Sequence, residues 1–136
     1  MVVLDGCRVH AEVWFDGACS GNPGPTGGGA IVVIGGARTV LSEHGGVGTN
    51  NEAEYLGLLV GLRHARERGA DTVTVRGDSQ LIIRQLEGRY QVKAPNLRPR
   101  YEEAKALLAG FTHVSLEWVP RAQNAAADQA ARDALQ

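Results

Sequence analysis

The spacing of apolar side chains changes abruptly near residue 49, and this change constrains the fold more than any other feature. Before it, residues 9–16 alternate between apolar and polar side chains, which is typical of a half-buried strand. After it, Leu56, Leu59 and Val60 recur at helical spacing. The chain is therefore expected to begin with sheet and to continue with helices packed on it.

Glycines divide the first third of the chain. Of the 18 glycines, 12 lie at or before Gly48, which predicts tight turns or close backbone approach there. The segment 21–27 is expected to be a break, and we also expect turns at Gly28-Gly29 and Gly35-Gly36. Two further strands are predicted between these breaks, over residues 30–34 and 38–44, the latter closed by Gly45-Gly46. Short connections favour an antiparallel meander.

The rest of the chain alternates helices with strands. Thr49 followed by Glu52 forms a capping-box pattern that opens a helix ending at Gly69. The remaining segments predict a strand over 72–76, helices over 79–86 and 96–108, a strand over 114–119 and a final helix over 123–135. This order predicts an α/β fold with a mixed five-stranded sheet, three antiparallel strands then two parallel ones, flanked by helices. We expect one domain over residues 1–136.

Charge and composition exclude several classes of protein. The net charge of −1 argues against a chain held to nucleic acid by a large basic field alone. No apolar run approaches the ~18 residues of a membrane span, and no secretory leader opens the chain. Cys7 and Cys19 are too few for a disulfide framework, so we expect reduced, half-buried thiols in a cytoplasmic protein.

Three carboxylates are candidate site residues, and strand propensity does not explain two of them, Asp16 and Asp78. Asp16 and Asp78 each follow a predicted strand, and sites in α/β sheets collect at the carboxyl ends of strands. Glu54 lies in the first turn of a helix, on a face shared with Gly57 and Gly61, which would let the helix approach the sheet. The alternatives are a strand-ending turn residue for Asp16, a helix cap for Asp78 and a dipole-stabilising acid for Glu54.

A fourth acid, Asp128, lies four residues after Asn124 on the same face of the last helix, or is simply a solvated helix acid. If the four acids converge, their mutual repulsion calls for a divalent cation. Oxygen ligands select Mg²⁺ or Mn²⁺ over zinc. Two such ions about 3.5–4 Å apart suit attack on a phosphodiester.

These residues lie in segments that resemble the type 1 ribonuclease H family (ribonuclease HI) over nearly the whole chain. The segments are residues 13–25, 49–54, 77–80 and 118–128. The resemblance implies a ribonuclease H-like fold and an endonuclease that hydrolyses the RNA strand of RNA–DNA hybrids. It also implies two Mg²⁺ ions, with Mn²⁺ as a substitute, and products with 5′-phosphate and 3′-hydroxyl ends.

The family's functional positions carry over to named residues. The resemblance implies catalytic, metal-binding roles for Asp16, Glu54, Asp78 and Asp128, and leaves Glu52 as a capping residue. It implies contacts with the minor groove of the hybrid for Asn22, Asn50, Asn51 and Gln80, whose amides can both donate and accept hydrogen bonds. It implies that Thr49 contacts a phosphate of the DNA strand while also capping its helix.

The sequence departs from some family members in two places. Residues 88–98 are too short for the lysine- and tryptophan-rich protrusion found in several members, and Tyr90 is expected to pack rather than stack on bases. No histidine stands between Pro120 and Asn124, where some members have one. Arg121 or Asn124 could substitute for it, and both are expected to contact substrate. Trp14 and Trp118, on strands, are expected in the core.

Three other functions are alternatives for a chain of this fold. A non-catalytic hybrid-binding module should lack one of the four acids, and none is missing. A resolvase or an integrase-like enzyme of the same superfold would not need the amide set that suits RNA. A domain of a reverse transcriptase is the third alternative, but a chain that begins with Met1 and ends after a helix favours a stand-alone protein. We also expect a monomer without a membrane partner.

Overall fold

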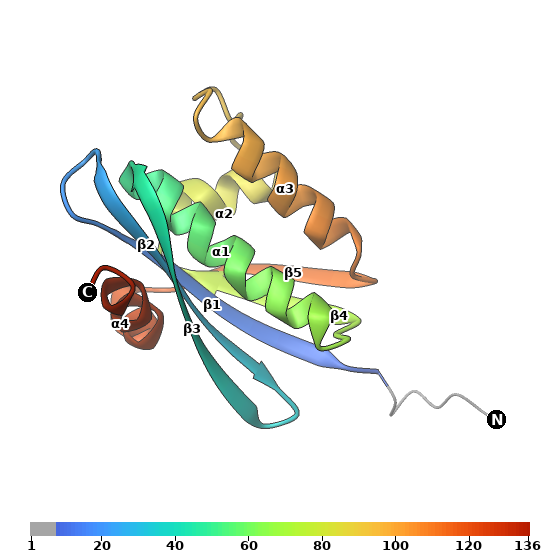
Figure 1. Cartoon of the computed structure of the whole chain (residues 1–136). Helices are drawn as coiled ribbons and strands as arrows, with labels where there is room; N and C mark the ends of the chain where they lie inside the picture. Colours follow the sequence, from blue (N-terminus) through green and yellow to red (C-terminus); the bar gives the residue numbers. More distant parts are fainter. Residues whose placement is uncertain (1–7) are drawn as a thin grey trace.

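A computed structural model describes residues 8–136; Cys7 lies outside the described residues. A five-stranded sheet carries α1, α2 and α3 on one face and α4 on the other (Figure 1). The elements are β1 (His10–Cys19), β2 (Gly24–Ile34), β3 (Ala37–Gly48), α1 (Asn50–Glu67), β4 (Thr72–Gly77), α2 (Gln80–Leu86), α3 (Arg98–Ala109), β5 (His113–Trp118), the 3₁₀ helix η2 (Arg121–Asn124) and α4 (Ala125–Asp133). Their order confirms the predicted order of strands and helices.

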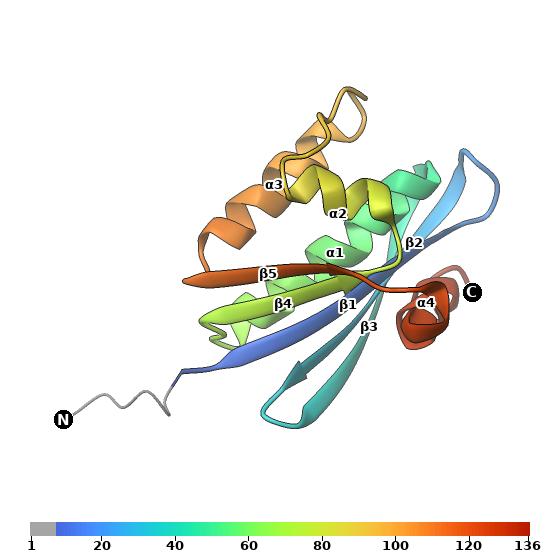
Figure 2. The ribbon, with the colours of Figure 1, turned by 180° about the vertical axis from the view of Figure 1, so that it is seen from behind.

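The sheet has the strand order β3-β2-β1-β4-β5. The first three strands pair antiparallel, whereas β4 pairs parallel to both β1 and β5, which confirms the predicted mixed sheet. The view from behind shows α4 separated from α2 and α3 by the sheet, next to the C-terminal end of the chain (Figure 2). Strand β1 continues three residues past its predicted end, so Asp16 lies inside β1 and is not a strand-ending turn residue, whereas Asp78 directly follows β4.

The core lies between the sheet and α1. The face of β1 predicted to be apolar is buried, with Ala11, Val13 and Phe15 each at most 1% exposed. Tyr55 and Leu58 of α1 pack against this face. Burial of these side chains supplies the main driving force for folding.

Three aromatic residues depart from the prediction. Trp118 is 45% exposed and Tyr90 is 47% exposed, so neither is a core residue. Trp14 is half-buried, and the guanidinium carbon of Arg76 lies 5.0 Å from its ring centre. Trp14 belongs to the sheet face opposite α1, where α4 is a single short helix and leaves part of the sheet uncovered.

Strand β2 is longer than predicted, because residues 24–27 of the predicted break lie inside it, as do Gly28 and Gly29, which were expected in a turn. A Cβ atom at Gly28 would lie 2.6 Å from the backbone nitrogen of Gly57 in α1. A Cβ atom at Gly29 would lie 2.3 Å from the backbone nitrogen of Ala131 in α4. Helices thus approach both faces of β2, and the absence of side chains, not a turn, explains these glycines. The turn at Gly35-Gly36 is as predicted.

Other boundaries differ by a few residues. Strand β3 continues past its predicted stop at Gly45-Gly46 and ends at Gly48, with a register shift in its partner strand between Thr26 and Gly27. Helix α3 begins at Arg98 and not at Asn96. The last predicted helix is divided into η2 and α4. Within residues 8–136, no helix is both long enough and apolar enough to cross a membrane.

Candidate active site

Parallel pairing of β1 and β4 brings the first two acids together. Phe15 of β1 stands in register with Gly77 of β4, and each is followed directly by an aspartate, Asp16 and Asp78. Parallel strands run in the same direction, so their carboxyl ends meet at one edge of the sheet. Ser79, not Asp78, caps α2, since its hydroxyl accepts a hydrogen bond from the backbone N–H of Ile82. The helix-cap alternative for Asp78 is therefore wrong.

Close backbone contact between α1 and β1 brings in the third acid. A Cβ atom at Gly17 would lie 2.2 Å from the backbone nitrogen of Glu54. A Cβ atom at Gly57 would lie 2.1 Å from the backbone oxygen of Asp16. Helix α1 can approach β1 this closely only because Gly17 and Gly57 lack side chains. Glu54 is thereby held beside Asp16.

Asp16, Glu54 and Asp78 form a cluster in which one carboxylate oxygen of each lies within 4.8 Å of the others. Asp16 is 4% exposed. Burial, followed by the charge of Asp78, raises the pKa of Asp16 to about 7, although the backbone N–H of Gly17 donates a hydrogen bond to this carboxylate at 2.9 Å. Burial and the charges of Asp16 and Asp78 raise the pKa of Glu54 to about 7. Ionising Asp16 and Glu54 in the folded protein therefore costs free energy.

Asp128 stands beside this cluster, at the start of α4. Its charge contributes to the raised pKa of Asp16, after burial and Asp78. One of its carboxylate oxygens lies 3.2 Å from a guanidinium nitrogen of Arg132, one helical turn further on. The four acids converge from four different elements, β1, α1, α4 and the end of β4.

The cluster opens into a cleft of about 440 Å³. Trp118 and Arg121 line it together with the three acids. Arg121 lowers the pKa of Glu54, against the larger effect of burial, so its positive charge acts within the cleft. Trp118 donates a hydrogen bond from its indole Nε1 to the backbone oxygen of Asp78 at 3.1 Å. No sequence pattern indicated that this strand tryptophan would line the cleft and hold the backbone of Asp78.

The donor set fits a hard divalent cation. All the candidate ligands are carboxylate oxygens, which Mg²⁺ and Mn²⁺ prefer. Like charges held this close, with raised pKa values, are stabilised when a cation binds between them. The cluster can therefore hold metal and bind a phosphate group through it.

A second cleft, of about 430 Å³, adjoins the start of α1 and shares Asn50 with the first. It is lined by Asn22, Thr49, Asn50, Asn51, Ala94, Asn96 and Leu97. The side-chain oxygen of Asn22 accepts a hydrogen bond from the backbone N–H of Asn50 at 3.1 Å, which joins the loop after β1 to the helix. The sequence predicts Asn96 as the start of a helix and does not indicate that it lines this second cleft.

The hydroxyl of Thr49 is engaged in the predicted capping box. It accepts a hydrogen bond from the backbone N–H of Glu52, whose carboxylate accepts one from the backbone N–H of Thr49. Gln80 is exposed at the first position of α2. Of the five amide residues expected to contact substrate, Asn22, Asn50 and Asn51 line the second cleft and Gln80 is exposed, whereas Asn124 is buried.

Asn124 is only 1% exposed and is turned inwards. Its side-chain nitrogen donates to the backbone oxygen of Phe15 at 2.9 Å and lies 3.5 Å from a carboxylate oxygen of Asp78. This position contradicts the expected substrate contact, because the amide nitrogen contacts the backbone of Phe15 and the carboxylate of Asp78. Its geometry suits a residue that positions Asp78 and the end of β1.

Comparison with known proteins identifies the family. The sequence model of a family described as reverse transcriptase-like matches residues 14–134. Ribonuclease HI from Halobacterium salinarum is 44% identical over 132 residues, which are 96% of this chain and 65% of that protein. The chain belongs to the type 1 ribonuclease H family. A bifunctional protein from Mycobacterium tuberculosis is 46% identical over 123 residues, and the chain spans about a third of its length, 34%.

Solved structures of the ribonuclease H family share the fold. The N-terminal RNase H domain of a Mycobacterium tuberculosis protein, solved as a fusion with maltose-binding protein, superposes with a TM-score of 0.88 at 44% identity, covering 94% of each chain. LC11-RNase H1, solved in complex with an RNA/DNA hybrid, gives a TM-score of 0.83 at 32% identity, covering 91% of this chain and 95% of that one. The predicted ribonuclease H-like fold is thus confirmed.

Proposed function

We propose that this domain is an endoribonuclease that hydrolyses the RNA strand of RNA–DNA hybrids and leaves 5′-phosphate and 3′-hydroxyl ends. The observation that carries the proposal is the cluster of buried Asp16 with half-buried Glu54 and Asp78, which lines an open cleft. An adjoining cleft lined by amide side chains offers a surface for the duplex. The hybrid bound to LC11-RNase H1, a family member of the same fold, supports this substrate.

We assign two Mg²⁺ ions, or Mn²⁺ in their place, to Asp16, Glu54, Asp78 and Asp128. Such ions, when bound, activate a water molecule and stabilise the departing oxygen of a phosphodiester. The chain's own contribution is to hold the acids in place before substrate arrives. Backbone contacts fix Glu54 against Asp16, and the amide of Asn124 lies against Asp78.

The residues around the cluster position the duplex. Asn22, Asn50, Asn51 and Gln80 are assigned to the minor groove, where an amide can read a 2′-hydroxyl as donor or acceptor. Thr49, at the start of α1, is assigned to a phosphate of the DNA strand, which the N-terminal end of a helix attracts. Arg121 lines the cleft and is assigned to the substrate as a cation close to the scissile region.

The proposal extends to the size of the domain, its oligomeric state and its location. Residues 1–136 act as one catalytic domain. The domain acts as a monomer, and its location is the cytoplasm, a reducing compartment that suits a chain with only two cysteines. Because residues 88–98 carry no lysine- and tryptophan-rich protrusion, binding relies on the clefts themselves.

The test uses four end-labelled substrates: an RNA–DNA hybrid, double-stranded RNA, double-stranded DNA and single-stranded RNA, each with Mg²⁺ or with chelator. We expect cleavage only of the RNA in the hybrid, and none with chelator. Asp16→Asn should abolish turnover, whereas Asp133→Asn, which changes an exposed acid of α4 outside the cluster, should retain it. Equal cleavage of double-stranded DNA, or activity that survives Asp16→Asn, would overturn the proposal.

A further inference from the structure

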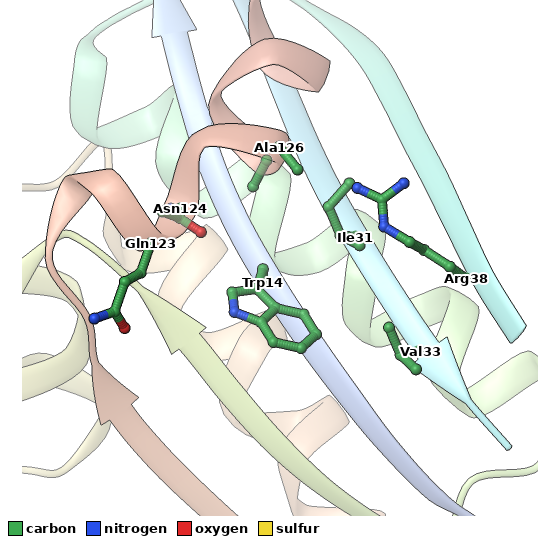
Figure 3. Close-up of a pocket in the computed structure, with 8 residues that line it drawn as sticks. Trp14, Ile31, Val33, Arg38, Gln123, Asn124 and Ala126 are labelled. Carbon is green, nitrogen blue, oxygen red and sulfur yellow. The ribbon is translucent and has the colours of Figure 1, made fainter. Parts of the chain in front are cut away.

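A small cleft of about 160 Å³ lies on the sheet face opposite α1 and shares no lining residue with the cleft at the acid cluster (Figure 3). Trp14, Ile31 and Val33 form its floor, and Ala126 with Ala127 of α4 forms one wall. A cavity of comparable volume, about 150 Å³, is large enough for a benzene ring. The size and the apolar walls therefore suit a small aromatic ring.

One polar atom in this region has no partner. The side-chain oxygen of Asn124 is buried, and no donor among residues 8–136 reaches it. Its amide orientation is fixed, because the side-chain nitrogen faces two acceptors, the backbone oxygen of Phe15 and a carboxylate oxygen of Asp78. Figure 3 shows this oxygen on the side of η2 that faces Trp14. A buried carbonyl oxygen without a donor is destabilising, so the site favours a ligand that supplies an N–H.

A cation stands at the mouth of the cleft. Arg38 of β3 lines it and is exposed. Within the described residues, no carboxylate lies within 4 Å of its guanidinium. Figure 3 shows Arg38 extending beside Ile31. An acidic substituent on the ring could form a bidentate pair with this guanidinium.

We propose that this cleft is a ligand site for a small aromatic carboxylate whose ring carries an N–H group. The ring packs on Trp14, Ile31 and Val33, the N–H donates to the side-chain oxygen of Asn124, and the carboxylate pairs with Arg38. The site is separate from the acid cluster, and it does not depend on the proposed nuclease activity. Asn124 lies between the ligand site and the acid cluster: it lines the cleft, and its side-chain nitrogen faces Asp78.

The probe is indole-3-carboxylate, titrated into ¹⁵N-labelled protein to about 10 mM, since a ligand of this size binds weakly. The chain has two tryptophans, so the indole N–H signals report both sites. We expect a saturable shift of the Trp14 signal and none of the Trp118 signal, which belongs to the acid cleft. A shift of Trp118 alone, or no saturable shift of Trp14, would overturn the proposal.

Two matched variants test the place of binding. Ala126→Leu adds bulk to the wall of the cleft, whereas Ala125→Leu makes the same change at the neighbouring exposed position, which does not line it. We expect binding at least about tenfold weaker in Ala126→Leu and unchanged in Ala125→Leu. Equal binding by the two variants would contradict this site.

A matched probe tests the N–H. Naphthalene-1-carboxylate keeps two fused rings and the carboxylate but has no N–H donor. Its binding should be at least about fivefold weaker, the effect of one lost hydrogen bond. Equal binding of the two probes would show that the oxygen of Asn124 does not recognise the ligand.

Discussion

A Cβ atom at Gly57 would lie 2.1 Å from the backbone oxygen of Asp16, so α1 rests directly on the strand that carries the first acid. The same helix carries Glu54 one turn earlier. The separation of the two acids is therefore determined by contact between main chains. Any side chain at this contact must push the helix away from the strand.

Gly57→Ala should lower the free energy of unfolding by about 2–4 kcal/mol, despite the better helix propensity of alanine. It should also reduce turnover, because Glu54 moves away from Asp16. Gly61→Ala is the matched control on the same helix, since the three atoms nearest to its Cβ atom would all be side-chain atoms, of Val13 and Ala30. Urea unfolding of both variants should show a clearly smaller loss for Gly61→Ala; equal losses would contradict this explanation.

The stability of the metal-free protein should fall as the pH rises from about 4 to about 7. Asp16 and Glu54 have pKa values near 7 in the fold, against 3.8 and 4.5 as the ordinary values. The folded state then binds protons that the unfolded state has released, so stability is greatest at low pH and is lost as these acids ionise. Thermal unfolding across this pH range, with chelator present, measures the slope.

Asp16→Asn is the control for this pH dependence. It removes one buried acid and weakens the repulsion on Glu54, so the slope should become shallower and the melting temperature near neutral pH should rise. Saturating Mg²⁺ should flatten the slope of the unsubstituted protein, because a bound cation favours the ionised acids. If the stability of Asp16→Asn depends on pH as steeply as that of the unsubstituted protein, the raised pKa values do not explain the pH dependence.

Thr49→Ala should cost about 1 kcal/mol of stability, because the backbone N–H of Glu52 loses the hydroxyl that caps it. Thr49→Ser keeps the hydroxyl and should restore most of that stability. Chemical unfolding of both variants checks the capping role. Hybrid binding at low and high salt checks the proposed phosphate contact, which Thr49→Ser should also retain.

The double variant Asn51→Ala and Gln80→Ala should weaken hybrid binding about tenfold while leaving metal affinity unchanged. Both residues lie outside the cluster of acids, so the ligands stay in place. The measurement compares kcat/KM for hybrids with ribose or 2′-deoxyribose near the cleavage site, and discrimination between them should shrink. A change in the Mg²⁺ dependence alone would contradict the assignment to the duplex.

Much of the fold followed from local patterns. The alternation over residues 9–16 identified the buried face of β1, and the Thr49–Glu52 pattern located the start of α1. Both signals depend on near neighbours in the chain, which a sequence displays directly. The cluster of Asp16, Glu54 and Asp78 was also expected, because acids that end strands and begin helices collect at one edge of such a sheet.

The errors came from long-range packing. Gly28 and Gly29 were expected in a turn, since a sequence does not show that helices approach both faces of one strand. Trp118 was expected in the core, yet it is the last residue of β5, the edge strand of the sheet, where it is 45% exposed and lines the cleft. The inward position of Asn124 depends on Phe15, which lies 109 residues earlier in the chain.

Main-chain contacts at Gly17, Gly29 and Gly57 connect β1, β2, α1 and α4. At these points the spacing of the elements is independent of which side chains fill the core. Substitutions elsewhere in the core can therefore accumulate over evolution, changing thermal tolerance while the spacing of the acids stays constant. A scaffold of this kind can diverge widely in sequence and still present the same four carboxylates.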